Sequence, residues 1–145
     1  MYSHILFPTD GEAPSITAVD NCMRFAKAIG ARVTILHVRA PFHILSIRAE
    51  VLADTPAEYV QHSKERGRLC LEQAAAAARE HGVACETVDL EHEHPYLAII
   101  NTARERHCDL VAMASHGRSG IEALLIGSQT QKVLTHSHLP VLVFR

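Results

Sequence analysis

The stretch DLVAMASHGRSGIEALLIGSQT, residues 109–130, decides how the chain folds. Its apolar run, Leu110–Ala114, is typical of a short buried strand. Small polar residues and glycines follow at 115–120, and the pair Gly127-Ser128 then opens a segment with the composition of a helix. A strand that leads through a glycine-containing loop into a helix is typical of an anion-binding unit.

The start of that last helix is the predicted anion site. The first amide N–H groups of a helix have no partner inside the helix, and the helix dipole places partial positive charge beside them. Glycine permits the close approach and the positive φ angles that a phosphate cradle needs. Gly117 precedes Gly127 by a spacer of nine residues, and we therefore predict a phosphate-binding loop.

The rest of the chain alternates between strand and helix patterns. Strands are expected at 4–7, 32–38, 83–90, 110–114 and 139–144, and helices at 14–29, 56–81, 95–107 and 129–136. Strands that are separated by helices require parallel crossovers and a sheet that is covered on both faces. The predicted fold is a single α/β domain over residues 1–145, with a doubly wound five-stranded parallel sheet.

Parts of this pattern are less regular. Gly67 lies inside the longest predicted helix, where it is tolerated but weakens the helix. Residues 39–55 are too apolar for a solvated linker, and we expect a connection that folds back over the sheet or joins an interface. In the first helix, Ile16 falls on the same apolar face as Val19 and Met23.

Composition and charge exclude several classes of protein. The chain has 145 residues, of which 48% are hydrophobic and 21% charged, with a net charge of −2, as in ordinary globular proteins. No cluster of Lys and Arg predicts a nucleic-acid surface, and no apolar stretch approaches the roughly 20 residues of a membrane span. The N-terminus lacks the features of a secretory signal, so we expect a cytoplasmic protein.

The cysteines and histidines do not predict a metal or disulfide site. The four cysteines are far apart and are expected to be buried thiols in a reducing compartment: Cys22, Cys70, Cys85 and Cys108. The pairs His92-x-His94 and His136-x-His138 each bring two imidazoles together, and His116 lies in the glycine loop. No third ligand is fixed by spacing, so we expect no physiological metal.

Three segments resemble the universal stress protein family. They are ILFPTDG at 5–11, DLVAMASHGRSG at 109–120, and LLIGSQTQKVL at 124–134 followed by LPVLVF at 139–144. Their order and spacing match the family over nearly the whole chain. The resemblance implies the strand order 3-2-1-4-5 and, commonly, a homodimer through the last strand, at 140–145.

The resemblance also implies a nucleotide site. ATP-binding members of the family carry the motif G-x2-G-x9-G-[S/T], in which Gly117 and Gly127-Ser128 supply the second and third elements here. Ala114 replaces the first glycine, and Gln129 stands where members often carry a small apolar residue. The implied ligand is ATP or another adenine nucleotide, alone or with Mg²⁺.

Roles follow from this resemblance residue by residue. Asp10 would form a hydrogen bond with the ribose or the adenine edge, with Thr9 beside it. Val38 would contact adenine, and Met113 would pack against the base. The glycine loop and the start of the last helix would hold the phosphates. The predicted binding residues are Thr9, Asp10, Val38, Met113, Ala114, His116, Gly117, Gly127, Ser128, Gln129 and Thr130.

Alternatives remain open for the site and for the function. Asp10 could instead cap the first helix, and the glycine loop could be a plain turn that binds nothing. No G-x-x-x-x-G-K-[S/T] motif and no G-x-S-x-G elbow is present, so no catalytic residue is assigned. We expect a regulatory or sensory nucleotide-binding protein; the alternatives are a ligand-free dimeric interaction module and a slow ATPase.

Overall fold

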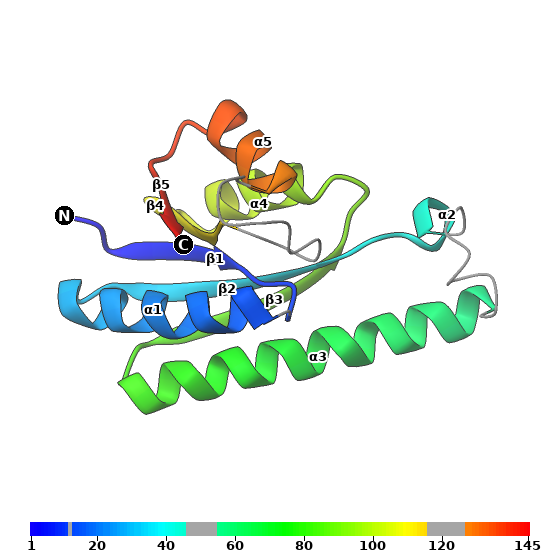
Figure 1. Ribbon diagram of the computed structural model, residues 1–145, viewed down its shortest axis with the longest axis horizontal. Coiled ribbons are helices and arrows are strands. Elements are labelled where there is room, and N and C mark those ends of the chain that lie inside the picture. Colours follow the sequence, from blue (N-terminus) through cyan, green and yellow to red (C-terminus); the bar gives the residue numbers. More distant parts are fainter. Residues whose placement is uncertain (12, 46–54, 116–126) are drawn as a thin grey trace.

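The fold is built on five parallel strands in the order β3-β2-β1-β4-β5 (Figure 1). The strands are β1 (His4–Pro8), β2 (Arg32–Arg39), β3 (Cys85–Glu91), β4 (Leu110–Ala114) and β5 (Val141–Phe144). The computed structural model describes residues 1–11, 13–45, 55–115 and 127–145. The predicted α/β architecture and strand order are thereby confirmed.

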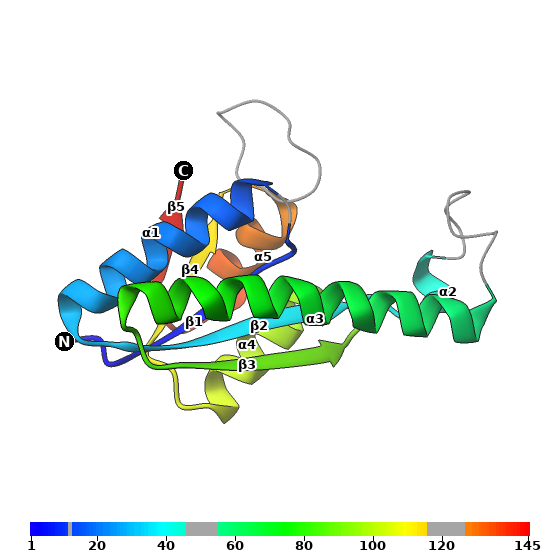
Figure 2. The same cartoon turned by 90° about the horizontal axis from the view of Figure 1, so that it is seen from below.

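Helices cover both faces of the sheet (Figures 1 and 2). On one face lie α1 (Ala13–Ile29) and α3 (Pro56–His81), and on the other lie α4 (Pro95–Glu105) and α5 (Ser128–His136). Each helix connects two parallel strands, which is the crossover pattern that alternating strand and helix signals predict. None of the described helices is long and apolar enough to cross a membrane.

Two apolar cores separate the sheet from its helices. Between the sheet and the α1/α3 layer, the core includes Ile5, Phe7, Met23, Ile35, Leu71 and Ala112. Between the sheet and the α4/α5 layer, it includes Leu6, Leu36, Ile99, Val111, Met113 and Val133. Successive strand residues alternate between these cores, as the geometry of a strand requires, and both faces of the central strands are therefore apolar.

The helix α3 has sharply defined ends. Thr55 accepts a hydrogen bond from the Glu58 N–H, and the Glu58 carboxylate accepts one in return from the Thr55 N–H, which forms a capping box. Gly82 ends the helix with φ of +65°, a conformation that glycine adopts without strain. The expected boundaries of this helix, 56 and 81, are confirmed.

Some expectations for individual side chains are wrong. Ile16 is 51% exposed rather than part of the core, because α1 turns this position away from the sheet. Cys85 is exposed at the start of an edge strand, whereas the other three cysteines are buried. Residues Phe42–Leu45 form a short helix, α2, and Phe42 packs against Tyr59 of α3 with ring centroids 5.4 Å apart. The part of the 39–55 connection beyond residue 45, up to residue 54, lies outside the described residues.

A polar network joins the amino ends of the strands. The Asp109 carboxylate accepts hydrogen bonds from the Ser3 and His4 N–H groups at 2.9 Å each. Nearby, the Thr34 hydroxyl donates to the Glu86 carboxylate at 2.7 Å and lies 2.7 Å from the His4 Nε2 atom. These contacts hold the N-terminal strand against its two neighbours at the end of the sheet opposite the predicted site.

Candidate functional site

The candidate site lies at the carboxyl ends of β1 and β4. These two strands are neighbours in the sheet, but β1 leads into α1 on one face and β4 leads towards α5 on the other. The chain therefore diverges here, and a crevice at such a switch point is where open α/β sheets bind ligands. The topology brings the predicted segments around residues 9–10 and 127–130 to the same edge.

The turn after β1 is held by its neighbours. The Thr9 N–H donates to the Leu36 carbonyl of β2 at 2.9 Å, which continues the sheet by one residue. The Thr9 hydroxyl lies 2.6 Å from the Ser15 hydroxyl of α1 and accepts a 3.3 Å bond from the Gly11 N–H. Gly11 has φ of +78°, a conformation that favours glycine, and Asp10 is half-buried between these residues.

The start of α5 is tied to the end of β4. The Thr130 hydroxyl donates to the Ala114 carbonyl at 3.2 Å, and the Gly127 N–H donates to the Ser115 carbonyl at 2.7 Å. The Ser115 N–H in turn donates to Phe144 of β5 at 2.7 Å. The helix start is thus fixed at the sheet edge by backbone and side-chain bonds.

The first turn of α5 presents donors for an anion. Gly127 occupies the N-cap position and has no side chain to cap the helix. Within the described residues, the structure gives the N–H groups of Ser128, Gln129 and Thr130 no partner. Three such groups at the positive end of a helix form an anion-binding arrangement.

The Gln129 side chain joins the starts of two helices. Its Oε1 atom accepts a 3.1 Å hydrogen bond from the Tyr96 N–H in the first turn of α4. The Tyr96 ring lies beside His136 of α5, with centroids 5.3 Å apart, and the Lys132 ammonium lies 5.5 Å from the Tyr96 centroid. Gln129 therefore acts as a structural link, and Lys132 packs over an aromatic ring.

Val38 and Met113 lie on the α4/α5 side of the sheet. Both pack in the core cluster of that side, where Met113 is 6% exposed and Val38 is half-buried at the end of β2. Ala114 packs in the other cluster, together with Phe144. The predicted residues Val38, Met113 and Ala114 therefore lie at or near the carboxyl ends of their strands, on both faces of the sheet.

Comparison with known proteins now identifies the family. The model of the Universal stress protein family matches residues 1–145. The chain belongs to the universal stress protein family. Its relative YxiE of Bacillus subtilis, a universal stress protein, is 31% identical, and the match covers 100% of each chain.

Solved structures of similar proteins have the same fold as this universal stress protein. The structure of MJ0577 of Methanocaldococcus jannaschii has a TM-score of 0.81 at 26% identity and covers 99% of this chain and 95% of that one. A universal stress protein in complex with cAMP has a TM-score of 0.68 at 25% identity and covers 99% and 97%.

Two residues of the predicted site, His116 and Gly117, lie outside the described residues of this family member. Among the residues that are described, no group of three or more His, Cys, Asp or Glu side chains is arranged to hold a metal ion. In the pair His92-x-His94, the His92 Nδ1 atom accepts a 2.9 Å bond from the His94 N–H. This imidazole therefore stabilises the turn before α4.

Two residues behind the turn after β1 were not predicted from the sequence. Ser15 lies in the first turns of α1, and Cys70 of α3 places its thiol 3.8 Å from the Thr9 hydroxyl. Burial raises the pKa of the Cys70 thiol, so the thiol stays protonated at neutral pH and donates. A single serine or cysteine in a helix carries no pattern from which such a contact could be predicted.

Proposed function

We propose that this universal stress protein binds an adenine nucleotide in the crevice between β1 and β4 as a regulatory ligand. One observation carries the proposal: the first turn of α5, with three amide groups that have no partner among the described residues, is bonded to the end of β4, and β4 is the sheet neighbour of β1, which leads into Asp10. A negatively charged phosphate is the ligand that such a helix start favours.

The surrounding residues suggest how the nucleotide would lie. The phosphates would accept hydrogen bonds from the Ser128, Gln129 and Thr130 N–H groups, and Asp10 would bond the ribose or the adenine edge. Val38 and Met113 supply apolar contacts for the base at the ends of β2 and β4. The structure of a family member in complex with cAMP, 25% identical to this chain, supports a nucleotide as the ligand.

A regulatory role fits this site better than rapid hydrolysis. Phosphoryl-transfer sites use a cation that grips the terminal phosphates, but the Lys132 ammonium of α5 packs over the Tyr96 ring. We therefore propose ATP, alone or with Mg²⁺, as a ligand that stabilises one arrangement of the crevice. Accumulation of ADP during hours of incubation would instead support the slow ATPase.

Calorimetric titration with ATP, AMP and cAMP, each with and without Mg²⁺, tests the proposal. We expect saturable heat for at least one adenine nucleotide. The absence of both heat and a thermal shift at millimolar nucleotide would overturn the proposal. Native mass spectrometry of the purified protein gives a second readout, since a bound nucleotide adds its mass to the protein.

The variant Ser128→Pro tests the helix start directly. Ser128 is the first residue of α5, and proline is tolerated at the first helical position although it lacks an N–H group. The preceding Gly127 has φ of −55° and ψ of 150°, which suits a residue before proline. Nucleotide affinity should fall about tenfold, because one charge-assisted hydrogen bond is lost. The melting temperature should stay within a few degrees of that of the parent protein.

The matched control is Ser128→Ala, which removes the hydroxyl and keeps the N–H group. It should bind nucleotide nearly as the parent protein does, because the proposal assigns binding to the backbone. Equal affinity in Ser128→Pro and the parent protein would show that this amide does not contact the ligand.

A further inference from the structure

The turn that carries Asp10 rests on buried side chains from three elements. We infer that Thr9, Ser15 and Cys70, here named the turn cluster, are positioning residues that set the Thr9–Gly11 backbone for nucleotide binding. In this arrangement the Thr9 hydroxyl makes no contact with the ligand. The inference rests on the proposed nucleotide site and adds to it residues of α1 and α3.

The hydrogen-bonding capacity of the Thr9 hydroxyl is fully used. A hydroxyl group donates one hydrogen bond and accepts two. The Thr9 oxygen accepts from the Gly11 N–H at 3.3 Å and from the Cys70 thiol at 3.8 Å. Its own proton therefore donates to the Ser15 oxygen, which lies 2.6 Å away. No donor or lone pair remains for a nucleotide.

The turn cluster is closed to solvent. Thr9 is 8% exposed, Ser15 is 3% exposed and Cys70 is 8% exposed. Buried polar groups that lose a partner are costly, because no water replaces the missing hydrogen bond. When one contact of the turn cluster is removed, we therefore expect the turn to shift, because the alternative is a buried polar group without a hydrogen-bond partner.

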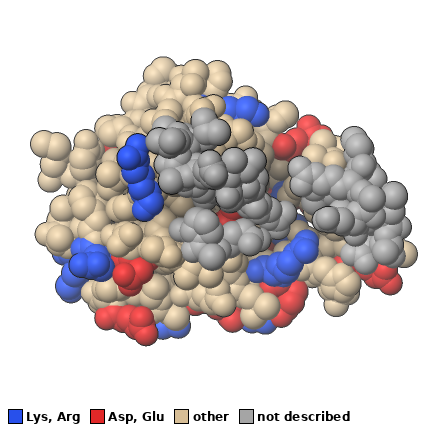
Figure 3. Space-filling model, viewed as in Figure 1, with Lys and Arg blue, Asp and Glu red and all other residues tan. Residues whose placement is uncertain are grey.

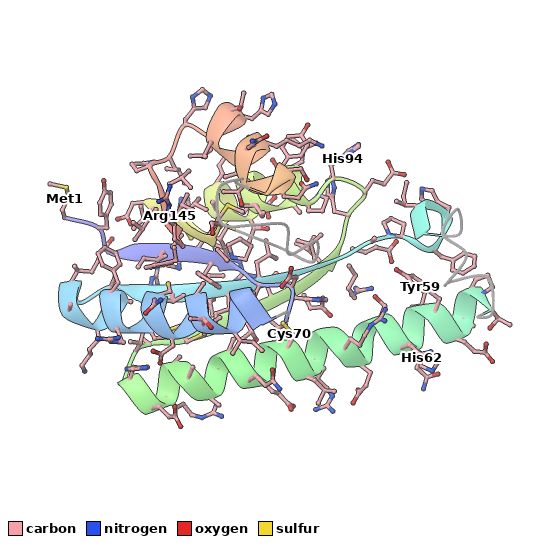
Figure 4. All side chains as sticks on the ribbon, viewed as in Figure 1. Met1, Tyr59, His62, Cys70, His94 and Arg145 are labelled. Carbon is pink, nitrogen blue, oxygen red and sulfur yellow. The ribbon has the colours of Figure 1, made fainter. Side chains whose placement is uncertain are left out.

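Gly11 brings α3 into direct contact with the turn. A Cβ atom at Gly11 would lie 3.3 Å from the Cys70 sulfur, so the backbone of the turn packs on the thiol without space between them. In Figure 4, Cys70 lies on the side of α3 that faces the start of α1, while His62 lies on the opposite side. The position of α3 thereby constrains the turn that presents Asp10.

The variant Thr9→Val tests this role, with Thr34→Val as its matched control. Both substitutions remove a buried threonine hydroxyl with several partners, but Thr34 is bonded to His4 and Glu86 at the opposite end of the sheet. Thr9→Val should weaken ATP binding in calorimetry about tenfold and accelerate hydrogen exchange of the Gly11 amide about tenfold. Thr34→Val should change either quantity less than about twofold, although it also lowers stability.

Two further variants keep the test decisive if Thr9→Val does not fold. Ser15→Ala removes the acceptor of the Thr9 proton at a helical position where alanine is favourable, and it should weaken binding about threefold, part of the value of one hydrogen bond. Thr9→Ser retains the hydroxyl and should restore most of the affinity that Thr9→Val loses.

The outcomes separate this inference from the proposed function. Unchanged affinity in Thr9→Val and Ser15→Ala, with ATP bound by the parent protein, overturns the positioning role alone. An equal loss of affinity in Thr34→Val also overturns it, since a general loss of stability would then explain the effect. If the parent protein binds no nucleotide, the proposed function and this role both fail.

Discussion

Two buried threonines serve opposite ends of the same sheet. Thr9 fixes the turn at the carboxyl end, while Thr34 donates its proton to the Glu86 carboxylate at 2.7 Å at the amino end. Because Thr34 has one proton, it accepts the hydrogen bond from His4, whose Nε2 atom lies 2.7 Å away. His4 is therefore the Nε2–H tautomer, and its Nδ1 atom is buried with no partner among the described residues.

This arrangement predicts a loss of stability in mild acid. Burial lowers the pKa of His4 below 6.5, and the positive charge of Arg32 adds a smaller contribution in the same direction. The negative charges of Glu86 and Asp109 oppose the shift. The unfolded chain then binds the proton more readily than the folded one. Stability is complete above about pH 6.5 and falls as the pH drops towards the folded-state pKa of His4. Urea denaturation between pH 7.5 and about 5 measures this dependence.

The variant His4→Gln should flatten the pH dependence in this window, since glutamine does not titrate. His138→Gln is the matched control, because His138 is exposed beyond the end of α5, and it should leave the dependence as it is. The Thr34 hydrogen bond lowers the pKa of Glu86, so this carboxylate becomes protonated only at a lower pH than His4 does. A parent protein equally stable at pH 7.5 and 5 would contradict the prediction.

At this scale the sequence predicts residue types better than residue partners. The sequence predicts Asp10 and Ser128 as site residues because Asp10 follows a strand and Ser128 opens a helix, and both features are local. Cys70 reaches Thr9 from 61 residues away, through the packing of α3 on α1. Such a contact depends on three elements at once, so no local pattern contains it.

Among the described elements, α3 is the longest. Its 26 residues span about 39 Å, more than the roughly 23 Å of the seven-residue strand β3. Its N-terminal part therefore extends beyond the sheet towards α2, as Figure 1 shows. Tyr59 supports this part by donating a 2.7 Å hydrogen bond to the Ala40 carbonyl.

Gly67 marks the point where α3 crosses β2 and β3. A Cβ atom there would lie 2.7 Å from the His37 Nδ1 atom and 3.0 Å from an Asp89 carboxylate oxygen. Those two side chains form an ion pair at 3.1 Å when His37 is protonated. The glycine therefore provides space for a polar contact beneath the helix, and the expectation that it merely weakens α3 is incomplete.

Replacement of Gly67 by alanine should consequently destabilise the protein. In an open helix this change stabilises by roughly 1 kcal/mol, but here the methyl group meets the His37 ring. We expect a net loss of about 1–3 kcal/mol in the free energy of unfolding, as for other overpacked sites. Chemical denaturation of the parent protein and Gly67→Ala measures this difference.

The double variant Gly67→Ala with His37→Ala supplies the control. Removing the imidazole ring takes away the shortest contact, so the double variant should recover about half of the loss relative to His37→Ala alone. A stabilised Gly67→Ala protein would instead show that α3 shifts away from the sheet at little cost. The sequence shows a glycine at position 67, but the requirement for glycine there comes from the short distance between α3 and the side chains of β2 and β3.

On the scale of the whole molecule, the parallel topology brings distant segments together. All five strands are parallel, so their carboxyl ends lie at one end of the sheet, and the turn at residues 9–11 and the start of α5 follow the ends of the neighbouring strands β1 and β4. Charges of both signs are mixed over α1 and α3, whereas the surface over α5 is largely uncharged (Figure 3). Residues 127–145 contain no Asp or Glu, so no acidic side chain from this segment would oppose the proposed phosphate.

The largely uncharged side of the molecule includes β5, which is an edge strand of the sheet. Leu142 and Phe144 pack against one core and Val141 against the other, while Val143 is half-exposed. An apolar edge strand readily pairs with a second copy.

We therefore propose a homodimer through residues 140–145. The variant Val143→Lys should make the protein monomeric, with a cost to the free energy of folding below about 1 kcal/mol. Light scattering after size exclusion measures the mass. Leu134→Lys, at a 43% exposed position of α5, is the control and should remain dimeric; a monomeric parent protein would contradict the proposed dimer.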